Sequence, residues 1–312
     1  LGSVDGQINN GGYDTFISKY NLSGTRIWTR MLGSSSDDYS SALTTGSDGS
    51  IYIGGYTFGN LDGQINNGSG DAFLTKYSID GTKIWTKLLG SSSYDKAYAL
   101  TTGNDGAIYI SGYTEGSLDG QLYNGNGDAF ITKYNADGTK AWTKLLGSIG
   151  YDYATALTTG NDGAIYVSGY TQGSFDGQTN SGGVDNFIVK YNPDGTKIWT
   201  KLFGSSSHDY DYALTTGSDG SIYTSGYTFG NLDNQVNNGS SDAFLAKYQG
   251  NTDATKSGTN LLGTTGNDGI TALAIAGDGS FYGSGFTEGN LDGQINNGLQ
   301  DAFLVTYHAD GT

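Results

Sequence analysis

The sequence predicts an all-β protein built from tandem four-stranded antiparallel sheets. The first reason is an internal repeat, because one Asp-Gly-Gln segment or a close variant returns along the 312 residues at spacings of 57, 57, 57, 57 and 59. The second reason is local pattern, since short runs rich in β-branched and aromatic residues alternate in polarity and end at Gly or Asp. No stretch has a helical period. The repeated aspartates are Asp5, Asp62, Asp119, Asp176, Asp233 and Asp292.

Each repeat holds four predicted strands, which we name D, A, B and C in chain order. In strand C of the second repeat, Phe130, Thr132 and Tyr134 share one face, and Ile131 and Lys133 share the other, as a period of two requires. The four strands predicted in this repeat are Thr82–Leu89 (D), Ala97–Thr102 (A), Ala107–Thr114 (B) and Asp128–Tyr134 (C).

Short turns and long loops are predicted to lie at opposite ends of each sheet. Residues 104–106 join A to B and residues 135–138 join C to D, both through Asp-Gly, where Gly can adopt a positive φ. Consecutive strands are therefore antiparallel neighbours, and the longer B–C and D–A loops gather at the other end. Long polar loops on a rigid scaffold commonly carry binding sites.

Tandem four-stranded units of this length are typical of a β-propeller, in which each blade buries its faces against its neighbours. From residue 26 onward, the chain divides into five repeats and predicts five blades, with part of a six- or seven-bladed ring as the alternative. The five repeats are 26–82, 83–139, 140–196, 197–253 and 254–312.

Ring closure is expected where the first strand D, Arg26–Leu32, pairs with the last strand C, Ala302–Tyr307. Trp28 would then lie in the same blade as Phe303. Residues 1–25 are surplus in this arrangement, and they hold a further strand C, Thr15–Tyr20, which competes for the same place.

The ordered motifs of the repeat resemble the bacterial SBBP repeat, a family named for seven-bladed β-propellers. The segments that carry the resemblance are residues 84–93 (IWTKLLGSSS), 99–114 (ALTTGNDGAIYISGYT) and 127–138 (GDAFITKYNADG), with counterparts along almost the whole chain. The resemblance implies a secreted or cell-surface bacterial protein of a family mostly without assigned activity. The five repeats and the Asn-rich B–C loop depart from the family pattern.

Composition excludes several classes of function. The chain has no Cys, which rules out disulfides and thiolate metal sites. A net charge of −16 disfavours nucleic acid and anionic membrane as partners. No apolar stretch approaches the roughly 20 residues of a membrane-inserted helix. Only Glu115 and Glu288 among the 31 acidic residues are Glu, and the Asp excess indicates turns.

The B–C loop repeats two carboxylates nine residues apart, with Asn66 between the pair of the first such loop. Calcium takes six to eight oxygen ligands of these types, so the loops could bind Ca²⁺, which is the single cofactor we consider. The spacing lacks the EF-hand pattern, and the alternative is that each Asp caps a turn. The candidate metal pairs are Asp62/Asp71, Asp119/Asp128, Asp176/Asp185, Asp233/Asp242 and Asp292/Asp301.

The D–A loop joins Tyr to Asp in most repeats. A Tyr ring offers a flat apolar surface with a polar end, and Asp can bond hydroxyl groups, so the pair suits a carbohydrate or a protein surface. The alternative is that the rings pack between blades. The candidate ligand-binding residues are Tyr39, Tyr94, Asp95, Tyr151, Asp152, Asp209 and Tyr210.

Catalytic residues are not evident. His208 and His308 occupy different positions in the repeat, and neither belongs to a recurring Ser/His/Asp set. We therefore expect a non-enzymatic binding or structural module. A multivalent lectin is the second hypothesis, and an enzyme such as a glycosidase or lyase is the third.

Overall fold

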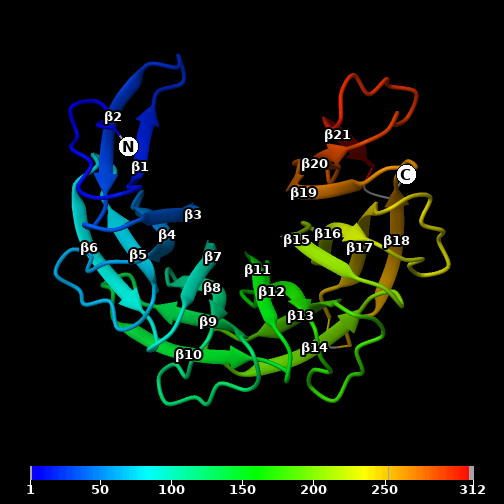
Figure 1. Ribbon diagram of the computed structural model, residues 1–312, viewed down its shortest axis with the longest axis horizontal. Helices are drawn as coiled ribbons and strands as arrows, with labels where there is room; N and C mark the ends of the chain where they lie inside the picture. Colours follow the sequence, from blue (N-terminus) through cyan, green and yellow to red (C-terminus); the bar gives the residue numbers. More distant parts are fainter. Residues whose placement is uncertain (1, 252, 309–312) are drawn as a thin grey trace. The chain divides into compact units, whose positions relative to one another are not determined.

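The protein is all-β, as predicted. The computed structural model describes residues 2–251 and 253–308, and 21 strands connected by turns and loops make up its regular structure (Figure 1). None of the described residues forms a helix able to cross a membrane. The chain divides into two compact units, residues 1–146 and 147–312.

Four sheets are complete, and each combines strands A, B and C of one repeat with strand D of the next. All neighbours within them are antiparallel. The first sheet is β3 (Asp38–Thr45), β4 (Ile51–Thr57), β5 (Asp71–Tyr77) and β6 (Lys83–Leu89). The second is β7 (Asp95–Thr102), β8 (Ile108–Thr114), β9 (Asp128–Tyr134) and β10 (Lys140–Leu146). The third is β11 (Asp152–Thr159), β12 (Ile165–Thr171), β13 (Asp185–Tyr191) and β14 (Lys197–Phe203). The fourth is β15 (Asp209–Thr216), β16 (Ser221–Thr228), β17 (Asp242–Gln249) and β18 (Lys256–Leu262).

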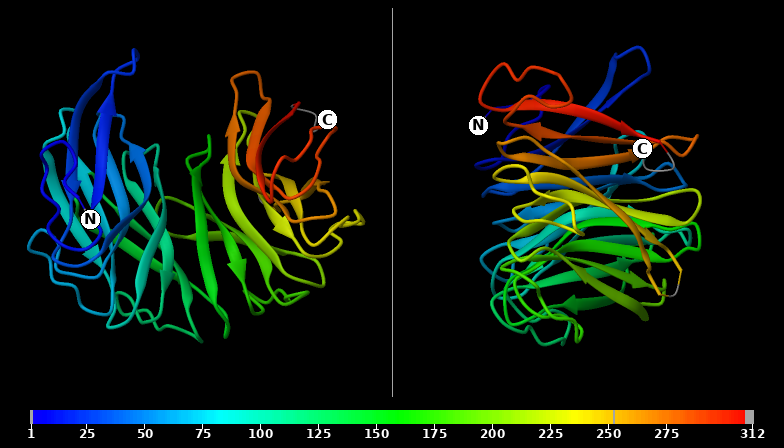
Figure 2. Two further views of the ribbon diagram at one scale, coloured as in Figure 1. Left: turned by 45° about the horizontal axis from the view of Figure 1, so that its top comes forward. Right: turned by 90° about the vertical axis from the view of Figure 1, so that its right-hand side faces the viewer.

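Two further sheets are partial. The first is the pair β1 (Thr15–Tyr20) and β2 (Arg26–Leu32), and the second is β19 (Asp268–Ile275), β20 (Phe281–Thr287) and β21 (Asp301–Tyr307) (Figure 2). In the second, β20 lies between β19 and β21.

The predicted closing pair of strands is wrong. β2 pairs with β1, which places Trp28 opposite Lys19 instead of in the sheet of Phe303. The physical reason is proximity, because a short turn joins β1 to β2 and a short loop costs little entropy to close. Residues 309–312 of the predicted fifth repeat lie outside the described residues.

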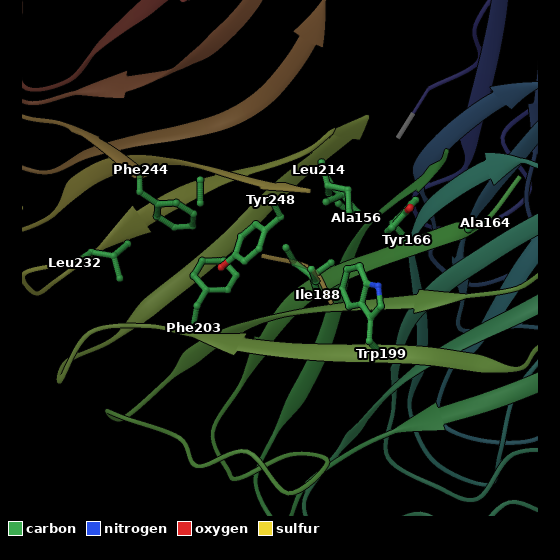
Figure 3. Close-up of a cluster of buried hydrophobic side chains, with 13 residues drawn as sticks. Ala156, Ala164, Tyr166, Ile188, Trp199, Phe203, Leu214, Leu232, Phe244 and Tyr248 are labelled. Atoms are coloured by element: carbon green, nitrogen blue, oxygen red, sulfur yellow. The ribbon is translucent and has the colours of Figure 1, made fainter. Parts of the chain in front are cut away.

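The core lies in strands B and C, where every residue of β8 is buried. In the second unit, Phe203, Phe244 and Tyr248 form part of one apolar cluster that crosses from one sheet to the next (Figure 3). Trp199 joins the same cluster from outer strand β14. Burying each large apolar side chain contributes about 1.5–3 kcal/mol, so contacts between sheets supply much of the stability.

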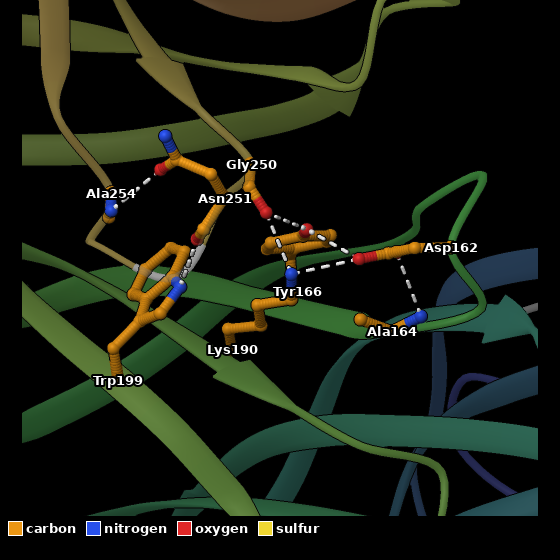
Figure 4. A network of polar contacts seen from close by, with 8 residues as sticks. All are labelled: Asp162, Ala164, Tyr166, Lys190, Trp199, Gly250, Asn251 and Ala254. Carbon is orange, nitrogen blue, oxygen red and sulfur yellow. Dashed lines mark hydrogen bonds and ion pairs between the residues drawn. The ribbon is translucent and has the colours of Figure 1, made fainter.

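At the end of the sheets that carries the A–B and C–D turns, side chains of the strands donate hydrogen bonds to the turns. Lys190 Nζ donates to Asp162 Oδ2 at 2.8 Å and to the Gly250 carbonyl at 2.7 Å, which links one repeat to the next (Figure 4). Trp199 Nε1 donates to the Asn251 carbonyl at 3.0 Å beside it. The Lys190 ammonium and the Trp199 indole are therefore occupied by structural contacts.

Candidate functional site

At the opposite end of the sheets, backbone contacts tie the B–C loop of one sheet to the D–A loop before the next. Gly70 bridges to Tyr94, Val184 to His208 and Ser241 to Asn267, each in a parallel pairing. The two kinds of long loop therefore form one surface within each unit. We call it the loop face.

The first Asp of each strand A lies beneath this face. Asp95 is fully buried, and its Oδ2 accepts from the Ser91 amide at 2.7 Å and from Ser91 Oγ at 2.9 Å. Burial raises the pKa of Asp95. Asp152 and Asp209 make the same contacts with Ser148 and Ser205. All three carboxylates, which we predicted as ligand contacts, support the loops from below.

In three of the predicted calcium pairs, the second carboxylate is buried near the first Asp of the following strand A. Asp71 Oδ2 accepts from the Asn67 amide at 3.1 Å. Burial raises the pKa of Asp71 to about 6, and the negative charge of Asp95 adds to the increase. Asp185 with Asp209 and Asp242 with Asp268 repeat this electrostatic relation in the second unit. The equivalent residues Asp128 and Asp301 are buried and half-buried, respectively.

The first carboxylate of each predicted pair has different neighbours. Asp62 has a positive φ of 52° and contacts Lys83 and Thr86 of β6. Asp119, Asp176 and Asp233 make the same Lys and Thr contacts with β10, β14 and β18. This Asp therefore fastens its loop to strand D.

Asn66, the remaining metal candidate, holds the loop in shape. Its Nδ2 donates to the Thr57 carbonyl at 3.0 Å, and its Oδ1 accepts from the Gly68 amide at 2.9 Å. Among residues 2–251 and 253–308, no group of three or more Asp, Glu or His side chains could hold a metal ion. Calcium binding stays a prediction.

Aromatic rings form a continuous row over the loop face of the first unit, which we call the first aromatic row. Tyr39 stacks on Tyr56 at 5.1 Å between centroids, and Phe58 contacts Tyr56 at 5.7 Å and Tyr94 at 6.0 Å. Lys96 Nζ lies 4.9 Å from the Tyr56 centroid and 5.7 Å from that of Tyr94. Tyr13 extends the row from Tyr39.

The second unit has its own row. Tyr153 contacts Tyr170 at 4.9 Å, Tyr170 contacts Tyr210 at 5.0 Å, and Tyr210 contacts Tyr227 at 5.3 Å. The remaining members of this second aromatic row are Tyr151, His208, Tyr212, Phe229 and Phe286.

The rows leave part of their rings accessible. Tyr94 is 39% exposed, Tyr151 37% and Phe229 41%. Four predicted candidates, Tyr39, Tyr94, Tyr151 and Tyr210, belong to the rows, while sequence reasoning missed their cross-strand partners such as Tyr56. The recurrence of the Gly-Tyr-Thr motif was the available sequence signal, and the structure places its Tyr directly opposite the second residue of strand A.

Comparison with known proteins supports a tandem-repeat fold. No family model matches the chain. Regulatory protein FlaEY of Caulobacter vibrioides is 25% identical over 237 residues, covering 65% of this chain and 24% of that protein. An uncharacterized WD repeat-containing protein, L264, of Acanthamoeba polyphaga mimivirus is 24% identical over 288 residues, covering 68% of this chain and 21% of that protein. The chain thus spans less than a quarter of the length of these relatives.

Among solved structures, a protein of unknown function from Dyadobacter fermentans matches with a TM-score of 0.51 at 13% identity. The match covers 87% of this chain and 75% of that one. This likeness concerns the fold alone. The observed order of strands and the WD repeat-containing relative agree with the predicted tandem four-stranded blades.

Proposed function

We propose that the chain is a non-enzymatic binding module of a bacterial surface or secreted protein, and that the two aromatic rows are its contact surfaces. The observation that carries the proposal is the continuity of partly exposed rings from Tyr39 to Tyr94 in the first unit. Extended aromatic surfaces of this kind bind flat or apolar groups, because rings bury a large area at a low cost in side-chain entropy.

A protein partner fits the rows better than a single sugar ring. The rings already contact one another, stacked between Tyr39 and Tyr56 and edge-to-face at Phe58, so they present an extended row with the Lys96 cation over it. Such a row suits a shallow protein surface, where aromatic residues are frequent anchors. A lectin with one weak site in each repeat remains the second hypothesis, because the Tyr and Asp residues recur.

The test uses a peptide array and a glycan array, probed with the wild-type chain and with Y94A and Y151A. Each replaced ring is partly exposed, so the variants are expected to fold. Y20A is the matched control, because Tyr20 is 56% exposed and ends β1 at the turn end of its sheet.

Peptide binding that Y94A or Y151A weakens and Y20A leaves unchanged supports the proposal. Loss of one anchoring aromatic ring typically costs about 2 kcal/mol or more, or about thirtyfold in affinity. Glycan binding with the same dependence supports the lectin hypothesis instead. Binding that neither variant changes contradicts both.

A further inference from the structure

The fifth residue of the B–C loop, counted from the repeated Asp, is Asn in every repeat except one. Asn66 represents the common case, because its Oδ1 accepts from the Gly68 amide at 2.9 Å and its Nδ2 donates to the Thr57 carbonyl at 3.0 Å. This Asn therefore holds the amide of the Gly two residues later. The same bond, at 2.9–3.1 Å, joins Gly11 to Asn9, Gly182 to Asn180, Gly239 to Asn237 and Gly298 to Asn296.

The loop of the second sheet is the exception. Tyr123 stands at the fifth position, and Gly125 follows two residues later. The phenol oxygen of Tyr lies at the far end of a ring, so Tyr123 has no oxygen near its own backbone to accept from the Gly125 amide. The backbone differs as well, because Gly125 has a positive φ of 105° and none of the five equivalent glycines does.

Five of these loops place Asn directly before the Gly. In an Asn-Gly segment, the Gly amide nitrogen can attack the side-chain carbonyl carbon of Asn, because Gly has no Cβ to hinder the approach. The nitrogen must first lose its proton and turn toward that carbon. An amide that donates to the preceding Asn is withheld from both steps. The segments are Asn10-Gly11, Asn67-Gly68, Asn124-Gly125, Asn238-Gly239 and Asn297-Gly298.

We propose that Asn124 is a site of spontaneous deamidation, while the other four segments are protected by their loops. The Gly125 nitrogen bonds to Cγ of Asn124, and the bond from Cγ to Nδ2 breaks. The amide proton of Gly125 leaves with Nδ2 as ammonia, and a cyclic imide remains. Water then opens the imide at either carbonyl, giving Asp or isoaspartate. One water is consumed and one ammonia is released, so no oxidant or reductant takes part.

Exposure to water does not explain the difference between the loops. Asn124 and Gly125 are exposed, so water reaches the imide. Asn67 and Asn238 are equally classed as exposed, and yet their Gly amides are bonded. The contact made by the fifth residue of the loop is therefore the feature that sets Asn124 apart.

Deamidation would change the loop face of the first unit. A new carboxylate appears at residue 124, whose backbone amide donates to Oδ2 of the buried Asp128 at 3.1 Å. The isoaspartate product also adds a methylene group to the main chain between this amide and Gly125. The reaction needs no partner and no aromatic ring, so this proposal and the proposed function stand or fall separately.

The test follows all five Asn-Gly segments in one sample of the native wild-type chain, held in mildly alkaline buffer and analysed by peptide mass spectrometry. We expect conversion at Asn124 to be about fivefold faster than at Asn67 or Asn238, because a hydrogen bond must break before the attack in those loops. In water labelled with heavy oxygen, the product should gain one labelled atom. In concentrated urea, the five rates should become similar, since the protection belongs to the folded loops.

Two variants test the cause. Y123N restores the acceptor and should slow conversion at Asn124 about fivefold, to the rate of Asn67. Y123F is the matched control, because it supplies no acceptor, and it should leave the rate unchanged. Equal rates at Asn124 and Asn67 in the native chain, a Y123N rate as fast as that of the wild type, or the same ratio of rates in urea would overturn the proposal.

Discussion

Strands β9 and β21 occupy the same place in their repeats and differ in one neighbour. β9 lies between β8 and β10, and six of its seven residues are buried. Among the strands that the structure describes, β21 pairs with β20 alone, and none of its seven residues is fully buried. The sequences DAFITKY and DAFLVTY are similar, so the difference comes from their surroundings: β21 has no strand D beside it, and every second residue of β21 is exposed, which leaves one face of the strand uncovered. Burial of a strand C is therefore completed by the following repeat.

Replacing the Phe at the third position of each strand should produce the largest difference in the free energy of unfolding. Phe130 is fully buried, so F130A should lower the free energy of unfolding by about 3–5 kcal/mol. Phe303 is only half-buried, and F303A should cost about 1–2 kcal/mol. Urea denaturation followed by circular dichroism measures both. Equal losses would show that the two Phe side chains are equally buried in solution.

Replacing the loop Asp of each sheet, Asp119 or Asp292, should produce a smaller difference in stability, again with the larger loss in the complete sheet. D119N removes the charge that meets Lys140 and should cost about 1 kcal/mol, because this ion pair is partly exposed. Asp292 has no ion pair or side-chain hydrogen bond within residues 2–251 and 253–308, so D292N should leave thermal stability almost unchanged. A destabilisation by D292N as large as that by D119N would show that Asp292 already has a partner.

Stability should also depend on pH through the buried carboxylates that lie where two sheets meet. The folded pKa of Asp71 is about 6, above its unfolded value near 3.8, and burial also raises the pKa values of Asp185 and Asp209. Between these two pKa values the folded state binds more protons than the unfolded chain, so stability falls as the pH rises from about 4 to about 6.

Melting temperatures measured across this pH range check the slope. D71N should flatten it, because Asn does not titrate. A wild-type melting temperature that increases from pH 4 to pH 6 would contradict the assignment, since lowered pKa values would then dominate.

Calcium should have the smallest effect on the melting temperature. Asp62, Asp119, Asp176 and Asp233 are satisfied by Lys and Thr of strand D, so their loops need no cation to fold. We expect equal melting temperatures in excess chelator and in millimolar calcium. A calcium-dependent increase that D119N/D128N abolishes would restore the metal hypothesis.

Periodicity made most of the fold predictable. The second repeat's predicted strand C matches β9 in both bounds, and its predicted strand A differs from β7 only in starting at Ala97 instead of Asp95. Alternation and Asp-Gly turns are local signals, so a single sequence carries them. The partner of Arg26–Leu32 was not predictable, because two strands with suitable patterns competed for it.

The candidate site was only partly predictable, for a physical reason. Exposed and buried carboxylates look alike in a sequence, so Asp95 was grouped with its neighbour Tyr94 although it lies beneath the loop face. The partners of Asp62 are more than twenty residues away on strand D. Contacts of this kind depend on register across a sheet, which spacing alone does not specify.

Hydrogen exchange tests most directly the central claim that β21 is the open counterpart of β9. Mass spectrometry of the wild-type chain would compare amide exchange in residues 128–134 with that in residues 301–307. We expect strong protection throughout β9 and rapid exchange of those β21 amides that point away from β20, because no acceptor among the described residues faces them. Equal protection of the two strands would contradict it, since it would mean that a strand already occupies the edge of β21.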